Sequence, residues 1–261
     1  MEKIALAKKI EFKDGAEKFE GQIIVEPLYP GYGMTLGNSL RRVLLSSLPG
    51  AAVVGVKVKG VSHEFTSLEH VKEDALEIVL NLKQLRLKMH TEEEVKLELS
   101  VSGKKVVTAG DIAKNSQVEI INPELVIANI TDPAGNLQLE IYTQAGRGYK
   151  MLEGGKRENA EIGFIETDSV FSPVLSVSIK VENVRVGKMT NWDRVVLNVK
   201  TDGTITYQEA FKESVEMLLE QFGALLPPAE DITETEVVVD EVEVSKEEPV
   251  LEEDKKKKSK K

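Results

Sequence analysis

The sequence predicts an α+β fold in which an antiparallel sheet and two amphipathic helices accompany an inserted, mostly-β second domain. Two segments, Leu36–Leu48 and Phe211–Leu225, repeat their apolar residues every three or four positions, the period of a helix with one buried face. Much of the remaining chain alternates apolar and polar residues in short runs that end at Gly, Pro or Asn, which is typical of antiparallel strands.

The chain begins with a predicted β-hairpin and continues into the first helix. Residues 4–11 and 16–27 are predicted strands around Asp14-Gly15, a strong hairpin-turn dipeptide. Gly31 and Gly33 permit a tight entry, Thr35 is the expected N-cap, and Pro49-Gly50 ends the helix. The apolar stripe of this helix consists of Leu36, Leu40, Val43, Leu44 and Leu48.

The opposite face of the first helix carries Arg41, Arg42 and Leu45. A solvated cationic face is the ordinary interpretation of such a pattern. A leucine among arginines also suits a protein contact, because the planar guanidinium pairs with carboxylates and stacks on aromatic rings. Composition alone leaves the two interpretations open.

The middle of the chain is predicted to be mostly strands with one helix. Residues 51–59 alternate as a half-buried strand, and Thr66 with Glu69 matches a capping box that would start a second helix. Glu77 and Lys83 lie off the apolar stripe of that helix, where a solvated face is the simpler interpretation. Four further strands are predicted from VKLELSV, QVEIIN, ELVIANI and LQLEIY, and Gly146–Asn159 is predicted to be an exposed loop.

The last predicted elements are two strands and the longest helix. Pro173–Val186 and Arg194–Thr201 alternate as strands joined by a turn at residues 187–193, and a capping box of Thr206 and Glu209 starts a helix that ends near Leu226. Burying one large apolar side chain is worth about 1.5–3 kcal/mol, so its stripe requires cover. The stripe fits the chain's own sheet or a second chain equally well: Phe211, Val215, Leu218, Leu219, Phe222 and Leu225.

These elements predict a division into three parts. We expect residues 1–51 and 171–227 to form one domain, residues 52–170 a second, and residues 228–261 a disordered acidic tail that ends in lysines.

Composition excludes several classes of protein. The formal net charge is −10, and residues 228–261 hold 12 Asp or Glu and 7 Lys, which leaves −5 on the body. An acidic body is a poor partner for phosphates, so contacts with other proteins are favoured over DNA. The absence of cysteine excludes disulfides, cysteine-ligated zinc and thiol catalysis, and it suits a cytoplasmic protein. We expect no signal peptide and no membrane span.

No motif in the sequence indicates a catalytic, cofactor-binding or metal site. His63-Glu64 begins like a zinc-protease helix, but Ser67 stands where the second histidine is required. No glycine-rich phosphate loop and no carboxylate cluster for two magnesium ions occur. We therefore expect no catalytic residues and no cofactor, although an unrecognised carboxylate site stays open as an alternative.

Several blocks of the sequence resemble the alpha subunit of bacterial DNA-directed RNA polymerase. GYGMTLGNSLRRVLLSSLPGAAV resembles the signature segment of that family, and the other matching blocks follow in the family's order. They cover roughly residues 1–227: VSHEFTSLEHVKEDALEIVLNLKQL, GRGY, FSPV, and TDGTI followed by a helix.

The resemblance implies a non-catalytic platform that forms a homodimer and recruits the two large catalytic subunits of a nucleotidyltransferase complex. It implies a dimer interface on the two long helices, formed by Leu36, Leu40, Val43, Leu44, Leu48, Phe211, Val215, Leu218, Leu219, Phe222 and Leu225. It implies large-subunit contacts at Arg41, Arg42, Leu45, Glu77, Lys83, Phe171, Ser172 and Pro173.

One feature departs from the family pattern. Alpha subunits usually continue through a linker into a small helical domain that binds upstream DNA, whereas here about 34 residues follow Pro227. We expect no folded DNA-binding domain in this chain. A stand-alone adaptor that works through its acidic tail is the alternative function.

Overall fold

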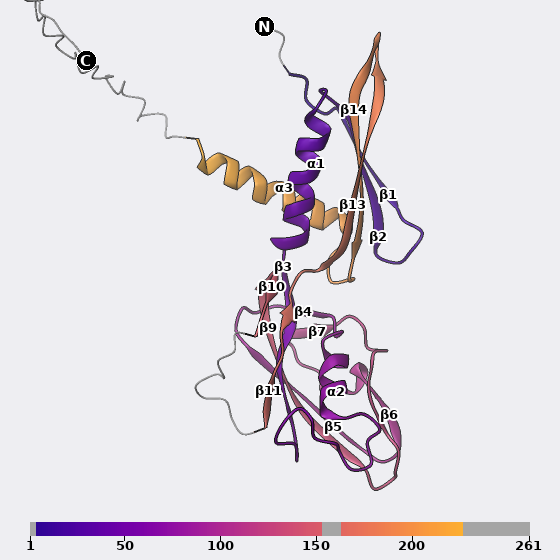
Figure 1. Ribbon diagram of the computed structural model, residues 1–261, viewed down its shortest axis with the longest axis vertical. Helices are drawn as coiled ribbons and strands as arrows, with labels where there is room; N and C mark the ends of the chain where they lie inside the picture. The colour runs from indigo at the N-terminus through magenta and orange to yellow at the C-terminus, as the bar shows by residue number, and fades with distance from the viewer. Residues whose placement is uncertain (1–3, 153–162, 227–261) are drawn as a thin grey trace, which may run out of the picture. The chain divides into compact units, whose positions relative to one another are not determined.

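The computed structural model describes residues 4–152 and 163–226 of the 261-residue chain (Figure 1). It is an α+β structure whose strand pairs are all antiparallel. The predicted tail at residues 228–261 lies outside the described residues, as does the part of the predicted loop from residue 153. None of the helices in the described ranges combines the length and the apolar character that a bilayer crossing requires.

The first sheet unites the two ends of the described chain. Its strand order is β1-β2-β14-β13, so the N-terminal hairpin pairs with the C-terminal hairpin. In the central pair, Ile23 lies opposite Leu197, and both side chains are fully buried. The strands of this sheet are β1 (Lys9–Asp14), β2 (Glu20–Leu28), β13 (Val174–Val186) and β14 (Met189–Thr201).

Helix α1 (Tyr32–Ser46) packs on β13 and β14 (Figure 1). It begins earlier than predicted, because Gly31 is the N-cap in a left-handed conformation with φ of 88°, and Thr35 lies inside the helix. A side chain at Gly37 would approach Ile179 of β13 to 3.2 Å, so glycine brings the helix close to the sheet. Helix α3 (Tyr207–Ala224) begins at the predicted capping box, where the Thr206 hydroxyl donates to the Glu209 carboxylate at 2.8 Å.

The inserted region is built on a second four-stranded sheet. Its order is β11-β3-β9-β5, with strands β3 (Pro49–Val58), β5 (Val95–Ser102), β9 (Asn136–Arg147) and β11 (Phe164–Glu166). Smaller elements surround it: β4 (Leu87–Met89) with β7 (Val118–Ile120), β6 (Lys105–Thr108) with β8 (Val126–Ile130), β10 (Tyr149–Lys150) with β12 (Ser169–Val170), and the 3-10 helix Ala109–Asp111.

The sequence predictions about helix α2 and about the turn between β13 and β14 of the first sheet were wrong. Helix α2 (Ala75–Leu82) begins at Ala75 instead of near Thr66, because its N-cap is Asp74, whose carboxylate accepts from the Glu77 N–H at 2.7 Å. The turn between β13 and β14 is also shorter than residues 187–193, since β14 already begins at Met189.

The described residues up to Gly223 form one compact unit that contains two hydrophobic clusters. The first cluster draws its buried residues from Val53 to Ile165, between the β3 sheet and α2. The second takes them from Ile23 to Leu48 and again from Val174 to Phe211, between the β2–β14 sheet, α1 and α3. Most of the buried apolar residues therefore belong to one of two separate cores.

Candidate interaction surfaces

An apolar groove lies between α1, α3 and the first sheet. Its volume is about 300 Å³, and apolar side chains of both helices and of β1, β2 and β14 line most of it. Leu36 and Phe222 stand at this groove with exposed fractions of 41% and 56%. An apolar hollow rimmed by exposed leucine and phenylalanine is typical of a surface that another chain covers.

The residues predicted for the dimer interface fall into three groups by burial in the structure. Four are buried in the chain's own core: Leu40, Leu44, Leu48 and Phe211. Val43, Val215 and Leu218 are half-buried. Four are exposed: Leu36, Leu219, Phe222 and Leu225. Each helix thus uses one side for its own core and keeps apolar side chains on its surface.

The other face of α1 presents its two arginines differently. The Nε of Arg41 donates to the Val177 carbonyl at 3.2 Å, which ties that side chain to β13. Arg42 is exposed, and among the described residues its guanidinium has no hydrogen-bond or ion-pair partner. Leu45 is half-buried against the second hydrophobic cluster, so its predicted position away from the core was wrong.

The GRGY and FSPV blocks come together in space. The Phe171 N–H donates to the Gly148 carbonyl at 2.8 Å, and a Cβ on Gly146 would lie 3.0 Å from the Phe171 ring. A Cβ on Gly50 would lie 1.8 Å from the Phe171 carbonyl oxygen. The close approach to Phe171 therefore requires glycine at Gly146 of the GRGY block and at Gly50 of the segment after α1.

Lys83 and Tyr149 converge on one carboxylate, that of Asp168. The Lys83 ammonium is 2.5 Å from Asp168 Oδ1, and the Tyr149 hydroxyl donates to Oδ2 at 2.6 Å. The hydrogen bond from Lys83, followed by that from Tyr149, lowers the pKa of the Asp168 carboxyl below its ordinary value. Sequence reasoning did not identify Asp168, because no motif marks it, whereas Tyr149 was within the quoted GRGY block.

The other residues predicted to contact a large subunit differ in how far their side chains are buried. Phe171 and Pro173 are buried, so their side chains serve packing within the chain, and Ser172 is half-buried between them. Glu77 is exposed near the start of α2, and in the described part of the chain its side chain forms no hydrogen bond or ion pair with Lys83 or Asp168.

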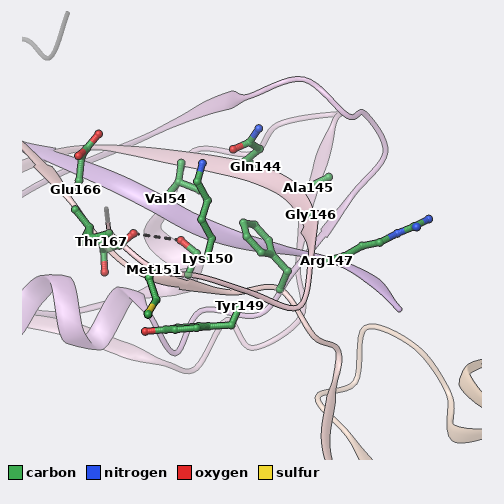
Figure 2. A pocket seen from close by; sticks show the side chains of 13 residues that line it. Val54, Gln144, Ala145, Gly146, Arg147, Tyr149, Lys150, Met151, Glu166 and Thr167 are labelled. Carbon is green, nitrogen blue, oxygen red and sulfur yellow. Dashed lines mark hydrogen bonds between the residues drawn. The ribbon is translucent and has the colours of Figure 1, made fainter. Parts of the chain in front are cut away.

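A cleft of about 710 Å³ lies beside Tyr149, the residue that donates to Asp168 (Figure 2). Residues from β3, β9, β10 and β11 line it, among them Val54, Gln144, Tyr149 and Glu166. Figure 2 shows Lys150 turned to the opposite side of its strand from Tyr149 and Met151, while Arg147 extends away from the other labelled side chains.

The titratable side chains of the described residues offer few candidates for a metal or catalytic site. In residues 4–152 and 163–226, no group of three or more His, Asp or Glu is arranged to hold a metal ion. Burial, with Glu209 and Glu216 nearby, raises the pKa of the Glu213 carboxyl on α3. Glu213 borders a second cleft that also contains Arg147 and Glu220.

A family model and several known proteins that are similar to this chain all belong to RNA polymerase. A family model described as the RNA polymerase Rpb3/RpoA insert domain matches residues 56–172. A DNA-directed RNA polymerase subunit alpha from Carboxydothermus hydrogenoformans is 45% identical over 239 residues, which are 92% of this chain and 76% of that protein. Proteins of the same name from Macrococcus caseolyticus (44% over 227 residues; 87% and 72%) and Moorella thermoacetica (45% over 235 residues; 90% and 74%) are similarly related.

Proposed function

Because the chain belongs to the family of bacterial DNA-directed RNA polymerase alpha subunits, we propose that it homodimerises and seats the two large catalytic subunits of that enzyme. In this proposal the nucleotidyltransferase chemistry is carried by the large subunits, and this chain supplies binding surfaces. The apolar groove between α1 and α3 is the observation that carries the proposal.

The groove supports a homodimer because apolar residues surround it. Leu219 and Phe222 on α3 are 66% and 56% exposed in the single chain, and Leu36 on α1 is 41% exposed. Burying a side chain of this size is worth about 1.5–3 kcal/mol. In a dimer with two-fold symmetry each contact occurs twice, so each residue contributes this free energy twice. The second copy would therefore place the exposed residues of its own α1 and α3 against this groove.

The proposed domain boundaries follow the two hydrophobic clusters. Residues 1–51 and 171–227 contribute the dimerisation domain, and residues 52–170 the domain that contacts the large subunits. The first cluster, from Val53 to Ile165, and the family match at residues 56–172 support this division.

Arg42 is the proposed contact for a large subunit on α1. Its guanidinium is exposed and has no partner among the described side chains, so it is available for a carboxylate or an aromatic ring of another chain. Arg41 is a weaker candidate, since its Nε already donates to the Val177 carbonyl.

The dimer is tested by replacing an exposed groove residue and measuring mass in solution. We expect Phe222→Asp to sediment as a monomer at micromolar concentration, while the wild type sediments as a dimer. Phe65→Asp is the matched control, because Phe65 is 72% exposed but lies far along the chain, between β3 and α2. A wild type that remains monomeric, or a Phe222→Asp variant that remains dimeric, would refute the groove as the dimer interface.

The large-subunit contact is tested by co-purification. We expect Arg42→Ala to remain dimeric but to retain neither large subunit stably, whereas Lys104→Ala, which removes an exposed charge from the β5–β6 turn, assembles normally. Truncation after Leu226 separates this function from that of an adaptor acting through its tail, because the scaffold retains its partners without residues 227–261.

A further inference from the structure

Strand β1 is an edge of the first sheet that the described residues leave open. In the order β1-β2-β14-β13 it pairs with β2 alone, so one side of its backbone has no strand partner within residues 4–152 and 163–226. Five of its six residues are exposed, and only Glu11 is half-buried. An exposed edge strand offers unpaired N–H and C=O groups to another extended segment unless something covers it.

One face of β1 is apolar and only partly covered. Ile10 lines the groove together with Phe222, and the Phe12 ring lies 6.0 Å from the ring of Phe211 on α3. The side chains of Ile10 and Phe12 are nevertheless 51% and 42% exposed. A strand added at the free edge would place its own side chains beside these two.

Lysines give β1 an excess of positive charge. Lys9 and Lys13 share the carboxylate of Glu11, and Lys13 Nζ lies 3.9 Å from its Oε2. Lys9 is also 3.9 Å from the carboxylate of Glu26 on β2. Lys8, the residue before the strand, is exposed and forms no ion pair with any described residue. Three lysines thus share two carboxylates, so acidic residues on an added strand would be favourable.

One segment of this chain complements both features. Residues 236–241 read EVVVDE, and residues 233–244 hold five carboxylates, five valines and no cation. When the segment is aligned antiparallel to β1, Val239 falls beside Ile10 and Val237 beside Phe12. In this alignment each acidic residue of EVVVDE falls opposite a lysine: Glu236 with Lys13, Asp240 with Lys9, and Glu241 with Lys8.

The neighbouring antiparallel alignments are less favourable. A slip of one residue moves the valines to the other face, so that Glu236 meets Phe12 or Asp240 meets Ile10. A slip of two residues places Glu236 or Asp240 opposite Glu11, and like charges directly opposite each other are destabilising. The pattern of charge and valine therefore selects one alignment.

The length of the connecting chain allows this pairing. Helix α3 begins beside the end of β1, where the Tyr207 hydroxyl donates to Asp14 at 2.8 Å, and Phe222 further along α3 lines the groove with Ile10. The nine residues 227–235 span up to about 30 Å when extended, whereas the six residues of β1 are about 20 Å long. Either end of β1 is within that reach.

We propose that residues 236–241 bind the free edge of β1 and add a fifth strand to the first sheet, in the antiparallel alignment given above. The added strand satisfies the open backbone groups of β1, covers Ile10 and Phe12 from the side, and prevents the edge from pairing with other chains. This inference goes beyond the proposed scaffold function, and its test requires no large subunit.

An introduced cysteine pair tests the alignment directly, because the sequence contains no cysteine. Residues opposite each other in an antiparallel pair have Cα atoms about 4.5–5.5 Å apart, a distance that a disulfide spans. We expect Lys13→Cys with Glu236→Cys to form a disulfide within one chain under mild oxidation. It should form about tenfold faster than in the control, Lys13→Cys with Asp240→Cys, where the two residues are too far apart.

The control is closely matched. It removes the same two charges and closes a loop of nearly the same length, so chain entropy favours neither pair. Residue 240 would lie about 13 Å further along the added strand than residue 236, but it would be opposite residue 13 if the strand ran parallel to β1.

Three outcomes of this experiment would overturn the proposal. Equal rates for the two cysteine pairs would show that the segment has no fixed alignment on β1. A faster reaction of the control would show a parallel strand. A disulfide that joins two chains, seen as doubled mass on a denaturing gel without reductant, would assign the edge to a second copy.

Amide hydrogen exchange gives a readout without substitutions in β1. The β1 N–H groups that face the free edge should exchange about tenfold more slowly in the wild type than in the chain truncated after Leu226. Amides of β5, an edge strand of the second sheet, are the internal control and should not change. Glu236→Lys, which sets a lysine opposite Lys13, should remove most of the protection. Equal exchange of β1 in the wild type and the truncated chain would refute the pairing.

Discussion

The carboxylate of Asp193 closes the N-terminus of α1 by accepting the Gly33 N–H at 3.0 Å. The same oxygen accepts the Gly31 N–H at 2.9 Å, and Asp193 is itself buried on β14. An acidic side chain at this position satisfies two free amides and complements the positive end of the helix. The start of α1 is therefore fixed by a residue about 160 positions further along the chain.

Gly33→Ala should destabilise the fold. A Cβ at Gly33 would lie 2.9 Å from the Asp193 carboxylate and 2.9 Å from Val181, and overpacking of this kind costs about 1–3 kcal/mol. Urea unfolding measures the loss. Gly223→Ala on α3 is the control, because nothing lies within 4 Å of a Cβ there. Equal stability of the two variants would contradict the close packing of α1 on β14.

Leu44→Ala and Leu219→Ala should separate folding from dimerisation. Leu44 is fully buried in the chain's own core, so its truncation should lower the free energy of unfolding by about 2–5 kcal/mol. Leu219 is 66% exposed, so its truncation should leave stability at high concentration nearly unchanged and raise the dimer dissociation constant. Chemical denaturation and sedimentation give the two values. The division of roles fails if Leu219→Ala destabilises the chain as strongly as Leu44→Ala.

Phe171→Ala should act on stability before it acts on assembly. The ring is buried against Gly146, and removal of a buried phenylalanine costs about 3–5 kcal/mol. We expect thermal unfolding of the isolated chain to shift strongly to lower temperature. An isolated variant of unchanged stability that no longer holds a large subunit would instead make Phe171 a direct contact.

Glu209 should give α3 a contribution to stability that disappears in acid. Hydrogen bonds from the Thr206 hydroxyl and N–H lower the pKa of the Glu209 carboxyl. A carboxyl whose pKa is lower in the folded state stabilises that state above its unfolded pKa of about 4.3, and the contribution is lost as pH falls through the lowered folded pKa. The stability difference between wild type and Glu209→Gln should therefore be constant from pH 5 to 7, because a Glu carboxyl with an unfolded pKa of about 4.3 is ionised in both states throughout that range.

Measurement of that difference by urea unfolding at stepwise lower pH should show it shrinking toward zero. Lys212→Gln is a useful control, because Lys212 keeps its charge throughout this range. A difference for Glu209→Gln that is independent of pH below 4 would remove the capping box as its source.

The local patterns of the sequence predicted the elements well where neighbours in sequence determine them. The capping box of α3 depends on contacts within a few residues. A hairpin at the N-terminus was also predicted, but its turn was misplaced, because Asp14 belongs to β1 and lies opposite Gly21, and the connection to β2 runs from Gly15 to Phe19. Thr66 was wrongly assigned as a helix start, because the true N-cap, Asp74, is followed by Glu77, which fits a cap equally well. A local motif cannot rank two competing caps.

The candidate surfaces could not be predicted from local patterns, because they depend on contacts between residues that are distant in sequence. Leu44 and Leu219 belong to similar apolar stripes, yet one is in the core and the other on the surface. That difference depends on how α1 and α3 meet the sheet. Likewise, the binding of Lys83 to Asp168 joins residues 85 positions apart, and no pattern in either segment records it.

The topology of the first sheet has a consequence for synthesis on the ribosome. Strand β2 is synthesised early, but it pairs with β14. Ile23 therefore cannot pack opposite Leu197 until Leu197 has left the ribosome. The cluster from Val53 to Ile165 is contiguous in sequence and can assemble during that interval. The nascent hairpin thus keeps one edge unpaired for most of translation, a period in which binding of the edge by a chaperone would protect it from aggregation.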